Sequence, residues 1–165
     1  MNEEAFMRRA IELAAVSLSI TGTLPYGAVI VKNDCIIAEG TNRSIVDCDP
    51  TSHGEIEAIR NACRDLRTTD LTGCDMYTSC EPCAMCVATM YMAGISKAFY
   101  ATTIADSKQM FSQLLQRDPK WVRRFDPLDV QVEVAKPIEN RSMPAQQLLQ
   151  AEGREIFDAF VKAQA

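Results

Sequence analysis

Residues 74–101, CDMYTSCEPCAMCVATMYMAGISKAFYA, decide the fold, because they run through a strand, a helix and a second strand without a break. The composition of 74–79 and of 96–101 is typical of strands. Between them a helix is predicted, with Pro82 at its first position and its end just before Gly94. Two strands joined by such a crossover are expected to lie parallel, with a right-handed connection. This unit indicates a layered α/β domain.

The sequence on either side supplies the other predicted elements. Apolar residues at helical spacing predict four helices, over 3–19, 53–66, 107–117 and 145–162. Strand-like runs predict three further strands, over 27–32, 35–39 and 130–135. Asn33-Asp34 is predicted as the tight turn of a hairpin, and 118–128 as irregular. Because no linker or repeat interrupts this order, one domain is expected over residues 1–165.

Composition sets limits on the location and partners of the protein. The chain has 165 residues, of which 47% are hydrophobic and 24% charged, and a net charge of −5. An acidic balance argues against nucleic acid as a partner, because nucleic-acid binders usually present a basic face. The first residues lack the positively charged segment followed by an apolar run that marks a signal peptide. No apolar run approaches the roughly 20 residues that span a membrane. We therefore expect a cytoplasmic protein with no membrane partner.

Two short motifs stand at the starts of two predicted helices. His53-Gly54-Glu55 begins the helix over 53–66, and Pro82-Cys83-Ala84-Met85-Cys86 begins the helix that follows the strand 74–79. In such α/β units each helix starts at the carboxyl edge of the sheet, so the two motifs are expected to lie side by side. Together they match the H-x-E…P-C-x-x-C signature of zinc deaminases, and they use the only histidine in the chain.

The residue types suit one catalytic Zn²⁺ per chain. A catalytic zinc ion takes three protein ligands and keeps one position for water, and His53, Cys83 and Cys86 provide one imidazole and two thiolates. A helix N-terminus also stabilises thiolates. Glu55 follows the histidine by two residues and is predicted to move protons between water and substrate without ligating the metal.

Three other readings of the same residues are open. Ser52 and Glu55 could form a capping box at a helix start. Cys80, Cys83 and Cys86 form a C-x₂-C-x₂-C run that is typical of iron–sulfur clusters, although the fourth cysteine of that run is missing. A non-catalytic zinc module is the third reading, and it would use Cys80 as a fourth ligand that closes the metal shell.

The chain resembles the cytidine deaminase superfamily over about residues 3–105, with its greatest likeness to the bacterial guanine deaminases. The resemblance rests on segments that run from Pro25 to Cys86, namely Pro25-Tyr26-Gly27-Ala28-Val29-Ile30-Val31, Ile37-Ala38-Glu39-Gly40, Asn42, Asp49-Pro50-Thr51, His53-Gly54-Glu55, Tyr77-Thr78-Ser79-Cys80-Glu81-Pro82-Cys83 and Met85-Cys86. It implies a three-layer α/β/α fold with a mixed five-stranded sheet. It also implies a zinc-dependent aminohydrolase that releases ammonia from an amino-bearing nucleobase, with guanine favoured.

The resemblance also implies how a substrate is held. Asn42 would hydrogen-bond the substrate ring, the backbone N–H of Gly54 would help to hold it, and Tyr26 would line the pocket. The chain has His-Gly-Glu where guanine deaminases usually have His-Ala-Glu, and Ser112-Gln113 where they carry an acidic pair. It also lacks their C-terminal aromatic residue. The match weakens over about 106–165, and Asp106 is the candidate to replace the missing acid.

Several questions of substrate and partner stay open at this point. Cytosine, another aminopyrimidine or aminotriazine, and a nucleoside are alternative substrates. A tRNA adenosine deaminase would share the zinc motifs, but it would need a basic surface for its RNA. The stretch 120–125, KWVRRF, is interpreted as a solvated helix with one buried aromatic residue. The predicted helix over 84–93 is apolar on nearly every face, which favours a homodimer.

Overall fold

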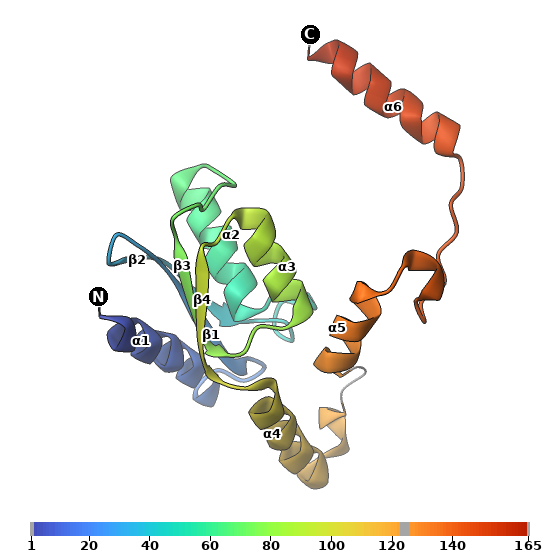
Figure 1. The fold of residues 1–165 in the computed structure, drawn as a ribbon. Coiled ribbons are helices and arrows are strands. Elements are labelled where there is room, and N and C mark those ends of the chain that lie inside the picture. The colour runs from blue at the N-terminus through green and yellow to red at the C-terminus, as the bar shows by residue number, and fades with distance from the viewer. Residues whose placement is uncertain (1, 123–125, 165) are drawn as a thin grey trace. The chain divides into compact units, whose positions relative to one another are not determined.

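A computed structural model of the chain describes residues 2–122 and 126–164. The packing of the backbone divides the chain into two compact units, Met1–Gln131 and Val132–Ala165. The first unit contains the sheet and the two predicted motifs (Figure 1). A single functional domain over 1–165 therefore stays a prediction.

The sheet is mixed and has four strands within the described residues, in the order β2-β1-β3-β4. The middle strand β1 runs antiparallel to both of its neighbours, whereas β3 and β4 are parallel, as predicted for the two strands joined by a helix. Asn33 and Asp34 both have positive φ, 51° and 58°, which confirms the tight turn between β1 and β2. The strands are β1 Leu24–Lys32, β2 Cys35–Asn42, β3 Asp75–Cys80 and β4 Lys97–Thr102.

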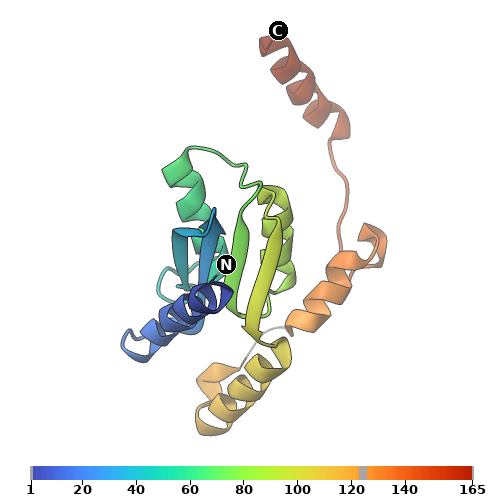
Figure 2. The same cartoon turned by 60° about the vertical axis from the view of Figure 1, so that its left-hand side comes forward.

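Helix α1, Glu3–Ala15, covers one face of the sheet (Figure 2). Asn2 is its N-cap, and its side chain accepts a hydrogen bond from the Ala5 N–H. Ala10 and Leu13 are buried against strand residues of the same face, which are Val29, Val31 and Tyr77. Because a Cβ at Gly27 would lie 2.5 Å from the Ala10 carbonyl oxygen, the helix rests directly on the strand backbone.

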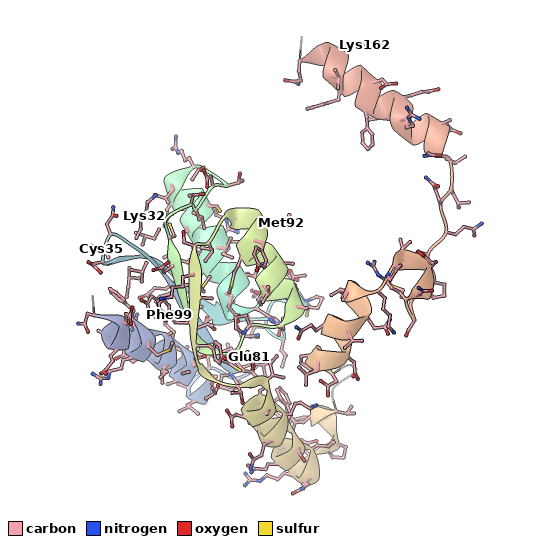
Figure 3. All side chains as sticks on the ribbon, viewed as in Figure 1. Lys32, Cys35, Glu81, Met92, Phe99 and Lys162 are labelled. Carbon is pink, nitrogen blue, oxygen red and sulfur yellow. The ribbon has the colours of Figure 1, made fainter. Side chains whose placement is uncertain are left out.

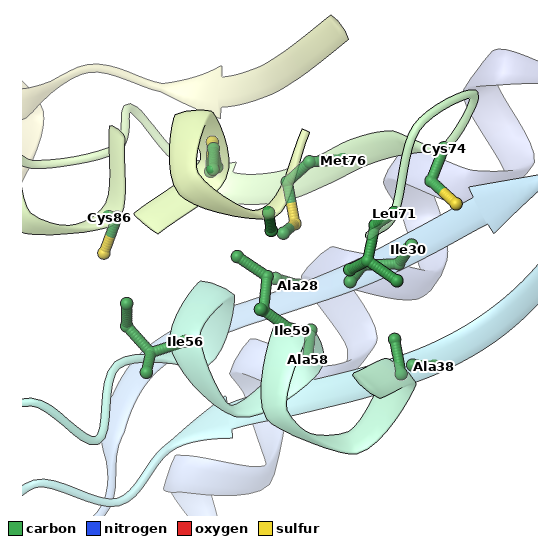
Figure 4. Close-up of a cluster of buried hydrophobic side chains, with 13 residues drawn as sticks. Ala28, Ile30, Ala38, Ile56, Ala58, Ile59, Leu71, Cys74, Met76 and Cys86 are labelled. Atoms are coloured by element: carbon green, nitrogen blue, oxygen red, sulfur yellow. The ribbon is translucent and has the colours of Figure 1, made fainter. Parts of the chain in front are cut away.

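Helices α2, Gly54–Leu66, and α3, Ala84–Ala93, lie together on the other face (Figure 1). Their buried side chains meet the inner residues of the sheet in the main core (Figure 4), formed by Ala28, Ile30, Ala38, Ile56, Ala58, Ile59, Ala62, Leu71, Cys74, Met76, Cys86, Met90 and Ala93. Gly94 ends α3 with a φ of 75°, as predicted. The helices therefore flank a mixed sheet on both faces, which confirms the predicted layers.

Helix α4, Ile104–Arg117, follows the end of β4. A capping box starts it, in which the Thr103 side chain and the Asp106 carboxylate each bind the other residue's backbone N–H. Near its other end, Phe111 packs edge-to-face on Trp121 of the 3₁₀ helix Pro119–Trp121, with ring centroids 6.4 Å apart. The rest of the predicted basic and aromatic helix, residues 123–125, lies outside the described residues.

The predicted fifth strand over 130–135 is wrong, because these residues lie in helix α5, Pro127–Ala135. The alternating sequence VQVEVA is short, and a strong helix start precedes it. Pro127 occupies the first helical position, and the Asp126 carboxylate accepts the Leu128 N–H at 2.9 Å. The predicted five-stranded sheet is therefore corrected to four strands in the part of the chain that the structure describes.

The second unit includes helix α6, Gln150–Ala163, in which no residue is buried. This helix was predicted over 145–162 and begins later, because Leu149 adopts a left-handed conformation with a φ of 52°. Between α5 and α6, the N–H of Ser142 donates to the Glu133 carboxylate at 2.7 Å. Within residues 2–122 and 126–164, no helix is both long and apolar enough for a membrane span.

Candidate zinc site

The three predicted metal ligands meet at one point. Nδ1 of His53 lies 3.7 Å from Sγ of Cys83 and 3.5 Å from Sγ of Cys86, and the two sulfurs are 3.6 Å apart. Ligands placed tetrahedrally about 2.3 Å from a zinc ion would be separated by about 3.8 Å. The spacing and the donor types therefore fit Zn²⁺, and the three residues could hold it.

Two helix starts bring these ligands together. His53 is the N-cap of α2 and Cys83 the N-cap of α3, both with extended backbones, and Cys86 lies in the first turn of α3. The positive ends of both helix dipoles therefore face the site and favour thiolates. The hydrogen bond between the Cys83 and Cys86 sulfurs lowers the pKa of Cys83 to about 4 and raises the pKa of Cys86.

Glu55 lies in the first turn of α2 and lines the same pocket as His53 and Cys83. Its side chain is buried, with 5% of the residue exposed. Burial raises the pKa of the Glu55 carboxyl, because the charged form loses its hydration. A buried carboxyl group beside a metal site is suited to passing protons.

The pocket includes most of the predicted site residues. Its described lining consists of Leu24, Tyr26, Asn42, His53, Glu55, Cys80, Glu81, Cys83, Ile104, Ser107 and Pro127. Oδ1 of the buried Asn42 accepts hydrogen bonds from the N–H and hydroxyl of Ser44, at 3.1 and 2.9 Å. These bonds orient the amide and leave its Nδ2 as a donor for a ligand. The predicted substrate contacts Tyr26 and Asn42 thus lie beside the metal ligands.

Two predicted substrate contacts have different surroundings. Gly54 is buried at the first position of α2, packed so closely that a Cβ there would lie 3.0 Å from the Tyr26 carbonyl oxygen. Asp106 is exposed and does not belong to the described lining of the pocket. Its carboxylate caps α4 at Thr103, which holds the pKa of Asp106 below its usual range. Its predicted role in base recognition stays a prediction.

Sequence reasoning missed two polar residues of the pocket. Glu81 accepts the Ile104 N–H at 3.0 Å through Oε2, and the Ser107 hydroxyl lies 2.6 Å from the Tyr26 hydroxyl. Glu81 stands inside the Ser-Cys-Glu-Pro-Cys motif, two residues before a metal ligand, so its position could have drawn attention. Ser107 carries no such signal, because only the tertiary placement of α4 brings it to Tyr26.

The other readings of the motifs do not agree with the structure. Ser52 donates its hydroxyl hydrogen bond to Glu57 rather than forming a capping box with Glu55. The Cys80 thiol faces the carbonyl oxygen of Thr103 at 3.5 Å. The group of metal-ligating atoms found in the described residues contains His53, Cys83 and Cys86 without Cys80. The cluster therefore offers three candidate protein ligands, which is the number typical of a catalytic zinc ion.

The fold is a mixed sheet flanked by helices. At two helix starts it brings together one imidazole, two thiols and a buried carboxyl group. This combination is that of a zinc-dependent hydrolytic deaminase. The comparisons with known proteins agree with this class. Residues 1–102 match the cytidine and deoxycytidylate deaminase zinc-binding region, and the chain belongs to that family.

The similarity to one relative extends over nearly the whole chain. Guanine deaminase of Bacillus subtilis (strain 168) is 38% identical over 160 residues, which are 97% of this chain and 94% of that protein. Its X-ray structure matches with a TM-score of 0.83 over 98% of this chain and 95% of that one. The chain is thus a guanine deaminase homologue within the zinc-dependent deaminases.

Two further matches are confined to about two thirds of the chain. The crystal structure of NE0047 in complex with 2,6-diaminopurine is 30% identical and covers 66% of this chain and 60% of that one, with a TM-score of 0.62. A variant of NE0047 was crystallised with 8-azaguanine. The tRNA-specific adenosine deaminase of Buchnera aphidicola is 40% identical over 99 residues, 60% of each chain.

Proposed function

We propose that this protein is a guanine deaminase that hydrolyses guanine to xanthine and ammonia. One observation carries the proposal, namely that the similarity to Bacillus subtilis guanine deaminase includes the segment after residue 105. The match to the Buchnera tRNA-specific adenosine deaminase covers 60% of the chain. The net charge of −5 also supports a small uncharged substrate over an RNA.

The metal ligands and Glu55 have separate roles in this reaction. His53, Cys83 and Cys86 would hold one Zn²⁺, which when bound makes water acidic enough to act as a nucleophile at neutral pH. Glu55 takes a proton from the attacking water and delivers it to the ring nitrogen beside the carbon that loses its amino group. The carboxylate then takes the proton of the hydroxyl group added to that carbon and passes it to the departing amine, so that ammonia leaves and a carbonyl group remains. Its burial and its place in the pocket support this assignment.

The pocket residues outside the metal cluster hold the base. Asn42 donates its Nδ2 hydrogens to an acceptor on the ring, because its carbonyl oxygen is occupied by the two hydrogen bonds from Ser44. Tyr26 forms part of the wall, and the Gly54 N–H is the further backbone donor that the family resemblance suggests. A Cβ on Gly54 would lie 3.0 Å from the Tyr26 carbonyl oxygen, so β1 would have to shift by a few tenths of an ångström to accept an alanine there.

The test is a substrate screen with the zinc-loaded protein. Guanine, cytosine, adenine and guanosine are each supplied at equal concentration, and ammonia and the deaminated product are measured. We expect xanthine from guanine and much slower release from the others. Release of ammonia from cytosine alone would overturn the proposal. Conversion of the wobble adenosine of a tRNA to inosine would identify a tRNA adenosine deaminase. Binding of the tRNA to the protein should then depend steeply on the salt concentration.

We also propose that the protein is a homodimer that uses the outer face of α3. Tyr91 and Met92 on this helix are 81% and 86% exposed, although Cys86, Met90 and Ala93 on its other face are buried (Figure 3 labels Met92). Large exposed apolar residues of this kind are typical of an interface between subunits. Tyr91→Glu should lower the mass measured by light scattering from a dimer to a monomer. A cytoplasmic location rests on the sequence alone and stays a prediction.

A further inference from the structure

Helix α4 forms one wall of the pocket but is only lightly packed. Its buried residues are Ile104 and Phe111, and Phe111 contacts Trp121 of the neighbouring 3₁₀ helix. Ile104 and Ser107 line the pocket, so the distance between α4 and the metal ligands sets the space for a base. With so little apolar burial, the hydrogen bonds at the start of α4 have a large share in fixing that distance.

Glu81 holds the junction between β4 and α4 with both its backbone and its side chain. Its N–H donates to the Thr102 carbonyl oxygen, the last residue of β4, at 2.7 Å. Its Oε2 accepts the N–H of Ile104, the first residue of α4, at 3.0 Å. Figure 3 labels Glu81 where β4 meets α4. A residue of the β3–α3 loop therefore spans the turn that starts the pocket wall.

The same loop carries a metal ligand. Glu81 precedes Cys83 by two residues, and Cys83 is the N-cap of α3. The neighbouring Cys80 directs its thiol to the Thr103 carbonyl oxygen, and the Thr102 hydroxyl donates to the Ser79 carbonyl oxygen at 2.9 Å. The loop and the junction are thus joined at several points, and Glu81 is the charged member that also faces the pocket.

We propose that Glu81 is a positioning residue, which fixes α4 at the distance from the zinc ligands that a nucleobase requires. The inference rests on the proposed function, since it names what sets the width of that substrate pocket. Glu81 acts on the reaction through Ile104 and Ser107, and it transfers no proton. The hydrogen bond between the hydroxyl groups of Ser107 and Tyr26 also holds this wall.

The test separates an acceptor role from a charge role. Glu81→Ala removes the acceptor and should raise the KM for guanine about ten-fold or more, with a smaller change in kcat. Glu81→Gln keeps an oxygen that can accept the Ile104 N–H and should restore the KM to within about two-fold of the parental value. Glu81→Asp, whose shorter side chain cannot reach, should behave like Glu81→Ala and replaces it if that variant does not fold.

Two readouts do not depend on turnover. Zinc content should be one ion per chain in every Glu81 variant, and calorimetric binding of 8-azaguanine should weaken in Glu81→Ala and Glu81→Asp but not in Glu81→Gln. Hydrogen exchange of the Ile104 amide should accelerate in the same two variants. The exchange data test the hydrogen bond even if guanine is not the substrate. Failure of the proposed function would instead be seen in the substrate screen, as absence of guanine deamination by the parental protein.

A matched control lies near the other end of the same helix. Asp118 accepts the Lys120 N–H at 3.0 Å and does not line the pocket in the described residues. Asp118→Ala removes a carboxylate cap of the same kind and should leave KM unchanged. The proposal is overturned if Glu81→Gln is as impaired as Glu81→Ala, because the charge itself would then contact substrate. It is also overturned if Glu81→Ala binds 8-azaguanine like the parental protein or loses zinc.

Discussion

Residues 2–102 and residues 132–164 stabilise their structure in opposite ways. In the first region, helices rest directly on strand backbones, and a Cβ on Gly40 would lie 2.1 Å from the Gly54 carbonyl oxygen. In the second, no residue of α6 is buried, and a Cβ on Gly153 would meet nothing within 4 Å. Exposed apolar side chains nevertheless form one stripe of α6, namely Ile156, Phe157, Phe160 and Val161. The first region therefore contains its own core, whereas the second has apolar surface without an internal partner.

The largest expected effect is loss of the metal in the first region. Cys86→Ala removes a buried ligand, and we expect zinc content to fall below one tenth of an ion per chain and deamination to fall to the background rate. The exposed Cys35 provides a matched control, since Cys35→Ala should keep both zinc and activity. Metal analysis and ammonia release measure the two properties. Full zinc content in Cys86→Ala would contradict the three-ligand site.

A smaller loss is expected when the metal stays and the proton carrier is removed. Glu55→Gln keeps the size of the side chain but cannot exchange protons, so kcat should fall by about 10² to 10⁴. Zinc content should be unchanged, because Glu55 is not a ligand. Steady-state kinetics with the zinc-loaded variant measure the effect. A parental kcat in this variant would assign proton transfer to another group.

Two glycines test the difference between the regions directly. Gly40→Ala would push a methyl group into the backbone of α2, 2.4 Å from the Ala58 nitrogen, and should lower the free energy of unfolding by about 3 kcal/mol. Gly153 lies in open space within a helix, so Gly153→Ala should stabilise the helical state of α6 by up to about 1 kcal/mol and raise its helicity. Urea unfolding and circular dichroism measure the two effects. Equal destabilisation by both variants would show that α6 packs as closely as the first region.

The first region could be predicted because its motifs and its folding pattern agree. The strand, helix and strand around Cys83 and Cys86 predict which helix starts converge, and the zinc chemistry then requires His53 beside them. Each ligand position follows from local sequence together with one rule of topology. The same agreement is absent beyond Thr102, where no chemical motif restricts the choice between strand and helix.

The errors lie where tertiary contacts or short caps decide the outcome. Alternation over 130–135 indicated a strand, but Asp126 and Pro127 start a helix, and within the described residues no strand is paired there. Glu81 and Ser107 were missed because their role depends on where α4 starts against the sheet. An apolar and polar alternation that lasts for only six residues is too short to exclude a well-capped helix.

The smallest effect is expected from removing a single ion pair, and each region offers one such pair. Arg9 binds Glu39 through two hydrogen bonds, at 2.7 and 2.8 Å, and these lower the pKa of Glu39. In the second unit, Lys136 follows the end of α5 and donates a hydrogen bond to the Glu133 carboxylate, which lowers the pKa of Glu133 to about 2. A lowered carboxyl pKa adds stability above the unfolded value, about 4.3 for Glu, and that stability is lost as the pH falls through the folded pKa.

The two ion pairs should stabilise different parts of the structure, because one joins residues far apart in the sequence and the other joins residues close together. Arg9 and Glu39 connect α1 directly to β2. Arg9→Gln should therefore reduce the free energy of urea unfolding by under about 1 kcal/mol at pH 7, and by less at pH 3.5. Lys136 and Glu133 are three residues apart, and their pair can persist locally when the first region unfolds. Lys136→Gln should therefore leave the main unfolding transition unchanged at both pH values. A shift of that transition by Lys136→Gln would mean that the second unit unfolds together with the first.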